Sequence, residues 1–234
     1  MAYSKFRPGK LLLCTAMLAA TVFAQATAPR QNPNAAPPKK INARPAAPPT
    51  KTTEPAAEPF DTASVAQMAS ECVRMETEAG VIEIEMLAEA APNTVRNFLN
   101  LAATGGFDTT YFHRIVKNFV VQGGNLATRG TMTPALAQRL RRTVPDEPNY
   151  VKHVRGIVSM ARSDQPNSAT TSFFILVGDA PHLDNKFAAF GRVRRGLEVA
   201  DEMNSAPAEG EKPTKPVQLI RATTAPCAQA AANR

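Results

Sequence analysis

From about residue 72 onward, apolar residues recur at two spacings, which predict two kinds of element. Between residues 81 and 87 they alternate, with Ile82, Ile84 and Met86 on one face, a pattern typical of a half-buried β-strand. The run at 73–77 and the short turn after it complete a predicted hairpin. Apolar, β-branched runs predict two strands within 111–125 and one each at 157–161, 172–177, 187–193 and 217–223.

The second spacing is helical. The clearest helix is expected over 92–106, because it begins with a proline, ends at two glycines and carries one apolar stripe. The stripe consists of Val95, Phe98, Leu99 and Ala102. Segment 196–206 repeats the same spacing, and short helices are expected within 61–71 and 134–142.

Eight strands and two main helices without a βαβ rhythm favour a mainly β fold. We expect a closed eight-stranded antiparallel β-barrel capped by two α-helices. A barrel of this size is filled by its own side chains. A small-ligand-binding barrel also fits the count, although the bulky inward residues weigh against a large lumen.

The N-terminal region has a different character. Residues 1–26 combine basic residues, an apolar run and a small-residue end, which predicts a secretory signal peptide cut after Ala26. The apolar run is shorter than a typical membrane span of about 20 residues. Residues 27–70 predict a Pro/Ala-rich disordered linker, because 27–60 alone contain nine prolines. The folded domain is expected over 71–227, with a disordered tail at 228–234.

This signal peptide, called the leader below, predicts a periplasmic or secreted protein without stable membrane insertion after cleavage. The alternative is that residues 1–26 remain as an uncleaved N-terminal anchor. The net charge of +7 falls to +4 without the leader, as 24 basic residues then face 20 acidic ones. That balance is weak evidence for a polyanion partner, and no nucleic-acid motif accompanies it, so we expect no nucleic acid partner. No exposed apolar stripe demands a dimer, and a monomer is expected.

One charged residue stands in an otherwise apolar stretch. Residues 111–125, YFHRIVKNFVVQGGN, place Arg114 among aromatic and branched side chains. Burying an unpaired guanidinium is costly. From the residues alone, Arg114 either pairs with a carboxylate, lies at the barrel edge or serves a site.

Six motifs recur in one order and with compatible spacing: FHR, QGG, SMAR, SFFI, HLD and AFGRV. Through them the chain resembles the cyclophilin-type peptidyl-prolyl cis–trans isomerases over about residues 72–223. The family's fold, an eight-stranded barrel capped by two helices, agrees with the strand count. The leader makes the chain similar to exported bacterial members.

The resemblance implies a site. Arg114 takes the position of the main catalytic side chain, Gln122 that of the glutamine that holds the substrate backbone, and His113 a supporting place beside them. Substrate-binding positions fall on Phe119, Val120, Ala161, Arg162, Phe174, Leu183 and His182. Simple alternation cannot place the arginine, the first phenylalanine and the glutamine on one face. A bulge or tight turn near residues 117–118 is therefore expected.

The chain departs from the family at four pocket positions. Arg162 replaces the usual asparagine, Ser172 a glutamine, His182 a tryptophan or phenylalanine, and Phe187 a histidine. These changes bear on substrate preference and rate, and the missing tryptophan predicts weak cyclosporin binding. They leave the arginine and the aromatic pocket in place.

The reaction that the resemblance implies makes and breaks no covalent bond, so no cofactor is expected. The three histidines are scattered and show no zinc-ligand spacing, so no metal is expected. Proline-containing unfolded or flexible polypeptides are the expected partners, and assistance to protein folding the expected role. A proline-peptide binding module or chaperone with little turnover is the alternative, and a small-ligand carrier on the same barrel is a third.

Two cysteines remain after the leader. Cys72 lies just before the first predicted strand and Cys227 just after the last. In a closed antiparallel barrel these strands can be neighbours, and an exported protein meets an oxidising compartment. We therefore predict a disulfide between them; two unrelated thiols are the alternative.

Overall fold

The computed structural model describes residues 57–227. The predicted signal peptide at 1–26, most of the predicted linker and the predicted tail at 228–234 lie outside the described residues. Within 57–227, no helix is long and apolar enough to cross a membrane.

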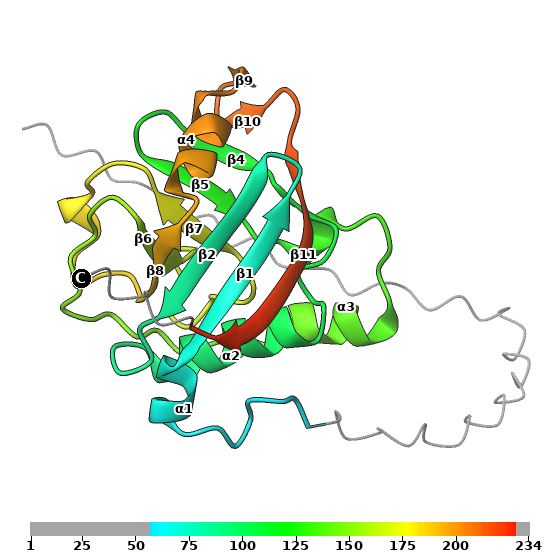
Figure 1. Ribbon diagram of the computed structural model, residues 1–234, viewed down its shortest axis with the longest axis vertical. Helices are drawn as coiled ribbons and strands as arrows, with labels where there is room; N and C mark the ends of the chain where they lie inside the picture. Colours follow the sequence, from blue (N-terminus) through cyan, green and yellow to red (C-terminus); the bar gives the residue numbers. More distant parts are fainter. Residues whose placement is uncertain (1–56, 228–234) are drawn as a thin grey trace, which may run out of the picture. The chain divides into compact units, whose positions relative to one another are not determined.

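Nine strands form one antiparallel sheet that closes on itself (Figure 1). They are β1 (Glu71–Thr77), β2 (Gly80–Met86), β3 (Thr110–Phe112), β4 (Arg114–Val116), β5 (Val120–Gly123), β6 (Ile157–Met160), β7 (Phe173–Leu176), β8 (Ala189–Arg195) and β11 (Val217–Pro226). Their order is β3-β11-β1-β2-β8-β6-β7-β5-β4. The two outer strands, β3 and β4, are separated only by His113, so one chain segment joins both ends of the sheet. The predicted barrel is confirmed, with one of its eight strands divided in two.

Helices cover the ends of this barrel. In Figure 1, α2 (Pro92–Ala103) lies below the sheet and α4 (Leu197–Ser205) above it. The two predicted short helices are present as α1 (Val65–Ala69) and α3 (Pro134–Leu140), and two 3-10 turns span Leu126–Thr128 and Pro181–Leu183. A small ribbon of β9 (Ala208–Glu209) and β10 (Lys212–Pro213) lies between α4 and β11.

Aromatic side chains fill the barrel. Phe98 of α2 lies at the centre, with its ring centroid 4.7 Å from that of Phe190 and 5.3 Å from that of Phe173. Phe107 and Phe112 complete the group, and all five side chains are at most 1% exposed. The apolar stripe predicted on this helix is therefore the surface that packs into the barrel. A carrier of small ligands needs an open lumen, so this packing argues against that alternative.

Residues 57–70 correct the predicted domain boundary. They were expected to be disordered, but they pack on α2. Phe60 donates its backbone N–H to Asn100 Oδ1 at 2.7 Å, and Arg96 donates to three carbonyl groups of this segment. Glu58 accepts hydrogen bonds from Arg139 and Arg142 at 2.8 and 3.0 Å. Polar side chains far along the chain therefore hold this segment, and Met68 within it is fully buried in the core.

The first and last long strands are joined covalently. β1 pairs with β11 from Glu71–Pro226 onward, and Cys72 and Cys227 form a disulfide with their Cα atoms 4.8 Å apart. The backbone N–H of Cys227 also donates to Ser70 O at 2.9 Å. The two ends of the described domain are thus fixed together at one edge of the barrel.

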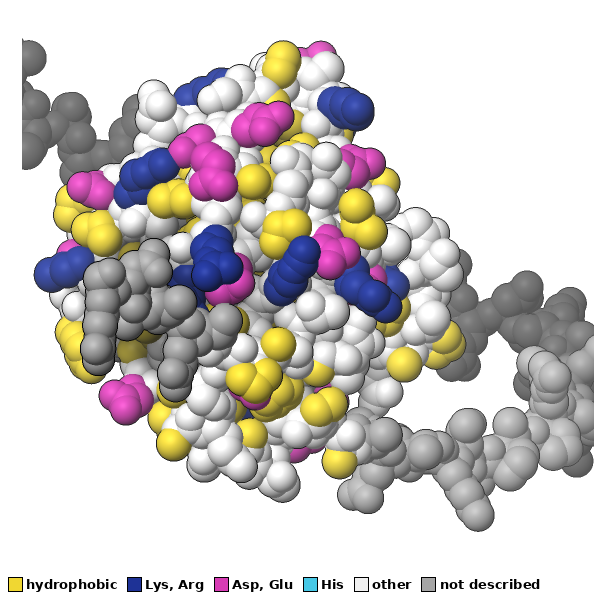
Figure 2. Space-filling model, in the orientation of Figure 1, with side chains coloured by type: hydrophobic (Ala, Val, Ile, Leu, Met, Phe, Trp, Pro, Cys, Tyr) yellow, Lys and Arg dark blue, Asp and Glu magenta, His cyan; other side chains and the backbone are white. Residues whose placement is uncertain are grey.

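The outer face of β1, β2 and β11 mixes charges of both signs (Figure 2). Glu83 and Glu85, which alternate with the buried residues of β2, have carboxylate oxygens 3.9 and 3.6 Å from the Arg194 guanidinium. Arg74 pairs with Glu76 beside them at 3.2 Å. These carboxylates therefore belong to surface ion pairs.

Candidate active site

The predicted break in the arginine stretch is a tight hairpin turn. β4 and β5 pair so that Arg114 lies directly opposite Gln122. The chain reverses at Asn118, whose φ of 57° is left-handed, a conformation that asparagine tolerates better than most residues. Because cross-strand partners share a face, the turn brings the arginine and the glutamine together.

The turn is held from α4 by Asn204. Its side-chain Oδ1 accepts from Asn118 N at 2.9 Å, and its Nδ2 donates to Val116 O and Val120 O at 2.8 and 3.0 Å. The Asn204 side chain is buried, and its three partners are backbone groups, of which the carbonyl of Val120 belongs to a buried residue. A single amide therefore satisfies the polar groups of the turn that carries the site.

We expect Asn204→Leu to lower the free energy of unfolding by about 2–3 kcal/mol, because it removes three hydrogen bonds at once, one of them to the buried carbonyl of Val120. Urea unfolding followed by circular dichroism measures this. Glu202→Ala, at an exposed position of the same helix, is the control and is expected to change stability by less than about 0.5 kcal/mol. Equal effects of the two substitutions would show that the turn does not depend on the amide.

The Arg114 guanidinium pairs with a carboxylate, that of Glu211, and with an amide, that of Gln122. Its Nη1 donates to Gln122 Oε1 at 3.1 Å, while its Nε and Nη2 donate to the two carboxylate oxygens of Glu211 at 2.6 and 3.1 Å. The side chain is 36% exposed. Hydrogen bonding to Arg114, together with its charge, holds the pKa of the Glu211 carboxyl below its usual range. The guanidinium is thus fixed on one side and open to solvent on another.

An apolar cluster, which we call the candidate pocket, lies on the strands next to β4, the strand that carries Arg114. Val120, Phe174 and Leu183 belong to one buried cluster, and Phe119 and Ala161 pack against it half-buried. The backbone N–H of Ala161 donates to Ser172 O at 2.9 Å, which joins the residue after β6 to the residue before β7. His182 is exposed, and its ring centroid lies 5.4 Å from that of Phe119. The structure therefore brings the predicted pocket residues together.

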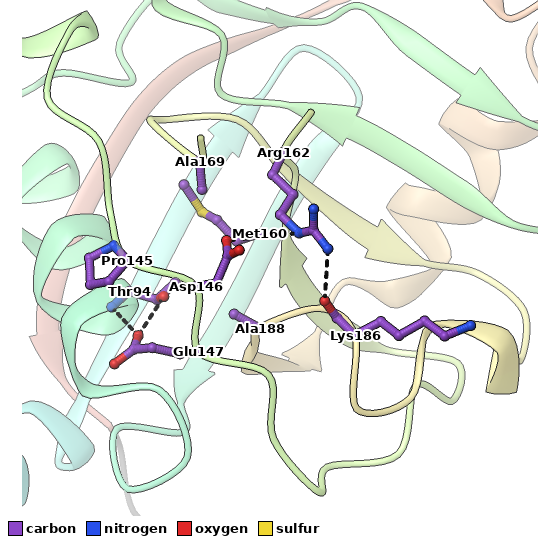
Figure 3. Close-up of a pocket in the computed structure, with 9 residues that line it drawn as sticks. All are labelled: Thr94, Pro145, Asp146, Glu147, Met160, Arg162, Ala169, Lys186 and Ala188. Carbon is purple, nitrogen blue, oxygen red and sulfur yellow. Dashed lines mark hydrogen bonds and ion pairs between the residues drawn. The ribbon is translucent and has the colours of Figure 1, made fainter. Parts of the chain in front are cut away.

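Two departures from the family pattern, Arg162 and Phe187, are in contact. The guanidinium carbon of Arg162 lies 4.9 Å from the centroid of the Phe187 ring, within reach of a cation–π interaction. Phe187 in turn packs edge-on against Phe174, with 6.0 Å between centroids. Figure 3 shows Arg162 donating to Lys186 O, at 3.3 Å, beside a small hollow. These two residues pack as a pair beside Phe174 of the candidate pocket.

The same hollow is bordered by Glu147, which caps α2 (Figure 3). Its carboxylate accepts from Asn93 N at 2.9 Å and from Thr94 N at 2.7 Å. Ala91, at the N-cap, supplies no side-chain bond of its own. A carboxylate at this end is favourable because the helix dipole is positive there, and it ties the loop of Glu147 to the barrel end.

His113 stands between β3 and β4 and is half-buried. Its backbone N–H donates to Gln122 O at 3.0 Å, and its ring Nδ1 lies 3.3 Å from Tyr111 O. The residue thereby continues the pairing with β5 across the break between the two short strands. Its contacts fit a supporting role in shaping the site.

A second histidine forms a buried network that sequence reasoning left unused. His153 Nδ1 lies 3.3 Å from Asp184 Oδ1, and Nε2 lies 3.1 Å from Ser159 Oγ. These are the three residue types of a hydrolase triad. However, Ser159 is fully buried and its hydroxyl donates to Ala188 O at 2.8 Å. The network therefore stabilises β6, the strand that carries Ser159.

This network predicts a loss of stability in mild acid. Burial lowers the pKa of His153, although hydrogen bonding to Asp184 opposes the shift. As the pH falls, the unfolded chain therefore takes up this proton before the folded chain does. The full contribution to the free energy of unfolding is present above the unfolded pKa of about 6.5. Below that pH the free energy of unfolding falls by at most about 1.4 kcal/mol per pH unit, until the folded pKa is passed.

Urea unfolding between pH 8 and pH 5 measures that loss. His153→Gln, which cannot take up the proton, is expected to flatten the dependence in this window, whereas exposed His182→Gln is expected to retain it. An unchanged slope in His153→Gln would assign the dependence to other groups.

Two features of the site were not predicted. Glu211 lies 97 residues from Arg114 in a segment with no apolar pattern, and nothing in its neighbourhood marked it. Asn204 stands on a predicted helix, where its polar character was the only available signal. Among residues 57–227, no group of three or more His, Cys, Asp or Glu side chains is placed to hold a metal ion.

Comparison with known proteins gives one consistent result. Residues 72–224 match the family described as cyclophilin type peptidyl-prolyl cis-trans isomerase/CLD. Peptidyl-prolyl cis-trans isomerase cypE of Dictyostelium discoideum is 35% identical over 67% of this chain and 99% of its own length. Human peptidyl-prolyl cis-trans isomerase-like 3 is 39% identical over 63% of this chain and 90% of its own.

Solved structures agree. A cyclophilin type peptidyl-prolyl cis-trans isomerase of Cryptosporidium parvum, crystallised in the presence of the dipeptide Ala-Pro, is similar with a TM-score of 0.57 and 29% identity. The match covers 65% of this chain and 97% of that one. Sequence relatives and structural neighbours thus agree on the same fold and the same family.

Proposed function

The chain belongs to the cyclophilin-type peptidyl-prolyl cis–trans isomerase family, and from this premise we propose that it accelerates X–Pro bond rotation in exported polypeptides through Arg114. The observation that carries the proposal is the position of the guanidinium, which is fixed opposite Gln122 beside an apolar pocket. Proline-containing peptides are the ligand class, in keeping with the Ala-Pro dipeptide present with the Cryptosporidium relative.

The chemistry requires no bond to form or break. The barrier of about 18–20 kcal/mol arises from amide resonance, and uncatalysed rotation takes tens of seconds or longer. As the bond twists, the proline nitrogen becomes pyramidal and gains a lone pair. A donor aimed at that lone pair stabilises the twisted amide more than either planar isomer, which is the condition for catalysis. Arg114 supplies such a donor, and its guanidinium presents its N–H groups in a rigid planar fork.

The residues of the candidate pocket are assigned to binding the substrate peptide. Phe119, Phe174, Leu183 and Val120 are assigned to the proline ring, because they belong to one apolar cluster on the strands next to that of Arg114. Gln122 and the backbone at 161–162 are assigned to the flanking peptide. His113 shapes the site, and His182 at the exposed rim contacts residues adjoining the proline. With the ring fixed, rotation turns the preceding carbonyl rather than the whole chain.

The main alternative is a module that binds proline peptides with little turnover. The departures at Ser172 and His182 motivate it, since both alter groups at the pocket rim. Measuring peptide affinity and isomerisation rate in one preparation separates the two. Binding with exchange near the uncatalysed rate would favour the module; fast exchange favours the enzyme. Faster refolding of a client limited by proline isomerisation would then support the role in protein folding.

We also propose that the protein is an exported member of the family, of the bacterial type. The sequence relatives named above are eukaryotic, so the proposal rests on the leader at 1–26 and on the disulfide, which suits an oxidising compartment. Mass spectrometry of protein expressed in a bacterial host is expected to find a chain beginning at Thr27 in the periplasm or medium. An intact leader in the membrane fraction would instead indicate an N-terminal anchor. A monomer is proposed, and analytical ultracentrifugation tests it.

A further inference from the structure

Glu211 lies where it can control the orientation of Arg114. It follows Gly210 at the tip of the β9–β10 ribbon, where the glycine adopts a φ of 61°. Its backbone carbonyl accepts from Ile115 N at 2.8 Å, and its carboxylate accepts from Nε and Nη2 of the neighbouring Arg114. The residue is therefore held by its backbone against β4 and binds the adjacent side chain with both oxygens.

We propose that Glu211 is a positioning residue for catalysis, which fixes the Arg114 guanidinium so that its free N–H groups face the prolyl nitrogen. The inference rests on the proposed role of Arg114. A guanidinium has five N–H donors. Glu211 takes two and Gln122 takes one, which leaves one donor on Nη1 and one on Nη2. The two acceptors thus define which edge of the group remains for substrate.

Orientation matters because the arginine is only partly enclosed. With 36% of its side chain exposed, Arg114 has room to adopt other rotamers. A two-point contact with a carboxylate matches the planar fork of arginine and restricts those rotamers. The negative charge of the Glu211 carboxylate also offsets part of the positive charge of Arg114. At this exposure water screens that charge effect strongly, so the geometric effect prevails and removal of the contact slows the reaction.

Positioning predicts a particular kinetic signature. The hydrogen bond to the prolyl nitrogen exists only in the twisted amide, so misalignment of its donor lowers kcat. The pocket residues that bind the planar peptide are untouched, so KM changes little. Loss of a merely structural ion pair would lower stability and leave both constants unchanged at temperatures well below unfolding.

The test compares Glu211→Gln and Glu211→Asp with Glu209→Gln in the full chain. Glu209 is exposed on the same ribbon, with Lys212 as its strand partner. Kinetic constants for a Xaa–Pro peptide are measured together with the NMR signal of the Arg114 Nε–H group. Protection of the Ile115 amide from hydrogen exchange reports whether the ribbon remains docked.

Glu211→Gln is expected to lower kcat about 5- to 10-fold with KM within about twofold, to shift or broaden the Nε–H signal, and to retain Ile115 protection. Glu211→Asp is expected to fall between this variant and the unmutated protein, and Glu209→Gln to match the latter. An unchanged or increased kcat in Glu211→Gln, in a chain that Arg114→Ala inactivates, would overturn the positioning role. An active Arg114→Ala chain would instead overturn the proposed catalytic role of Arg114, on which this inference rests.

Discussion

Replacing Arg114 with alanine is expected to lower kcat/KM for a Xaa–Pro peptide by about 100-fold or more. The variant loses the only donor assigned to the twisted amide, and removal of one such preorganised donor from an enzyme typically slows the reaction by about 10²–10³-fold. Isomerisation is measured by NMR exchange spectroscopy on a short peptide, so no coupling enzyme obscures the rate.

The fold is expected to survive this change. The Arg114 side chain is 36% exposed and the carboxylate of Glu211 is 56% exposed, so water can solvate the partner that is left behind. Arg114→Lys is the informative companion, because it retains the charge but loses the planar fork, and it is expected to recover only part of the rate. Arg192→Ala, at a side chain 57% exposed on β8, is the surface control. A rate within about twofold of the unmutated protein in a folded Arg114→Ala variant would contradict the mechanism.

The second large effect concerns stability. Replacing Cys72 and Cys227 together with alanine is expected to lower the free energy of unfolding by about 3–5 kcal/mol. The bond spans 155 residues, and in the chain-entropy model a longer closed loop restricts the unfolded state more strongly. For a domain of this size the loss corresponds to a fall in melting temperature of about 10 °C.

Thermal unfolding with and without reductant measures this contribution. Reductant is expected to lower the melting temperature of the unmutated protein towards that of the alanine variant, and to leave the variant itself unchanged. Turnover at 25 °C is expected to be retained, because the catalytic assignments involve neither cysteine. Equal melting temperatures for all preparations would show that the bond contributes little to the fold.

The barrel was predictable from sequence because its signals are local. Alternation over 81–87 and the stripe on α2 each depend on residues a few positions apart, and both specify which face is buried. The disulfide also followed, since the topology implied that β1 and β11 are neighbours. Even the turn at Asn118 was expected, from the requirement that Phe119 share a face with Arg114 and Gln122.

What the sequence did not reveal depends on polar contacts between distant segments. Residues 57–70 were assigned to the end of a disordered linker, with at most a short helix within 61–71, yet they are held by Arg96 and Asn100 of α2. Glu211 reaches Arg114 from a ribbon whose strands have only two residues each. A two-residue strand leaves no periodicity to detect, and a hydrogen bond across 97 positions leaves no local pattern. The contact between Arg162 and Phe187 escaped notice for the same reason.

The central claim is that the protein accelerates rotation of the X–Pro bond, and one measurement tests it most directly. NMR exchange spectroscopy of a short Xaa–Pro peptide with a catalytic amount of residues 57–234 compares cis–trans interconversion with the peptide alone. We predict exchange within a second or less, against tens of seconds or longer without the protein. Peptide signals that shift on binding while the two isomers exchange no faster than in free solution would contradict the account and indicate a recognition module.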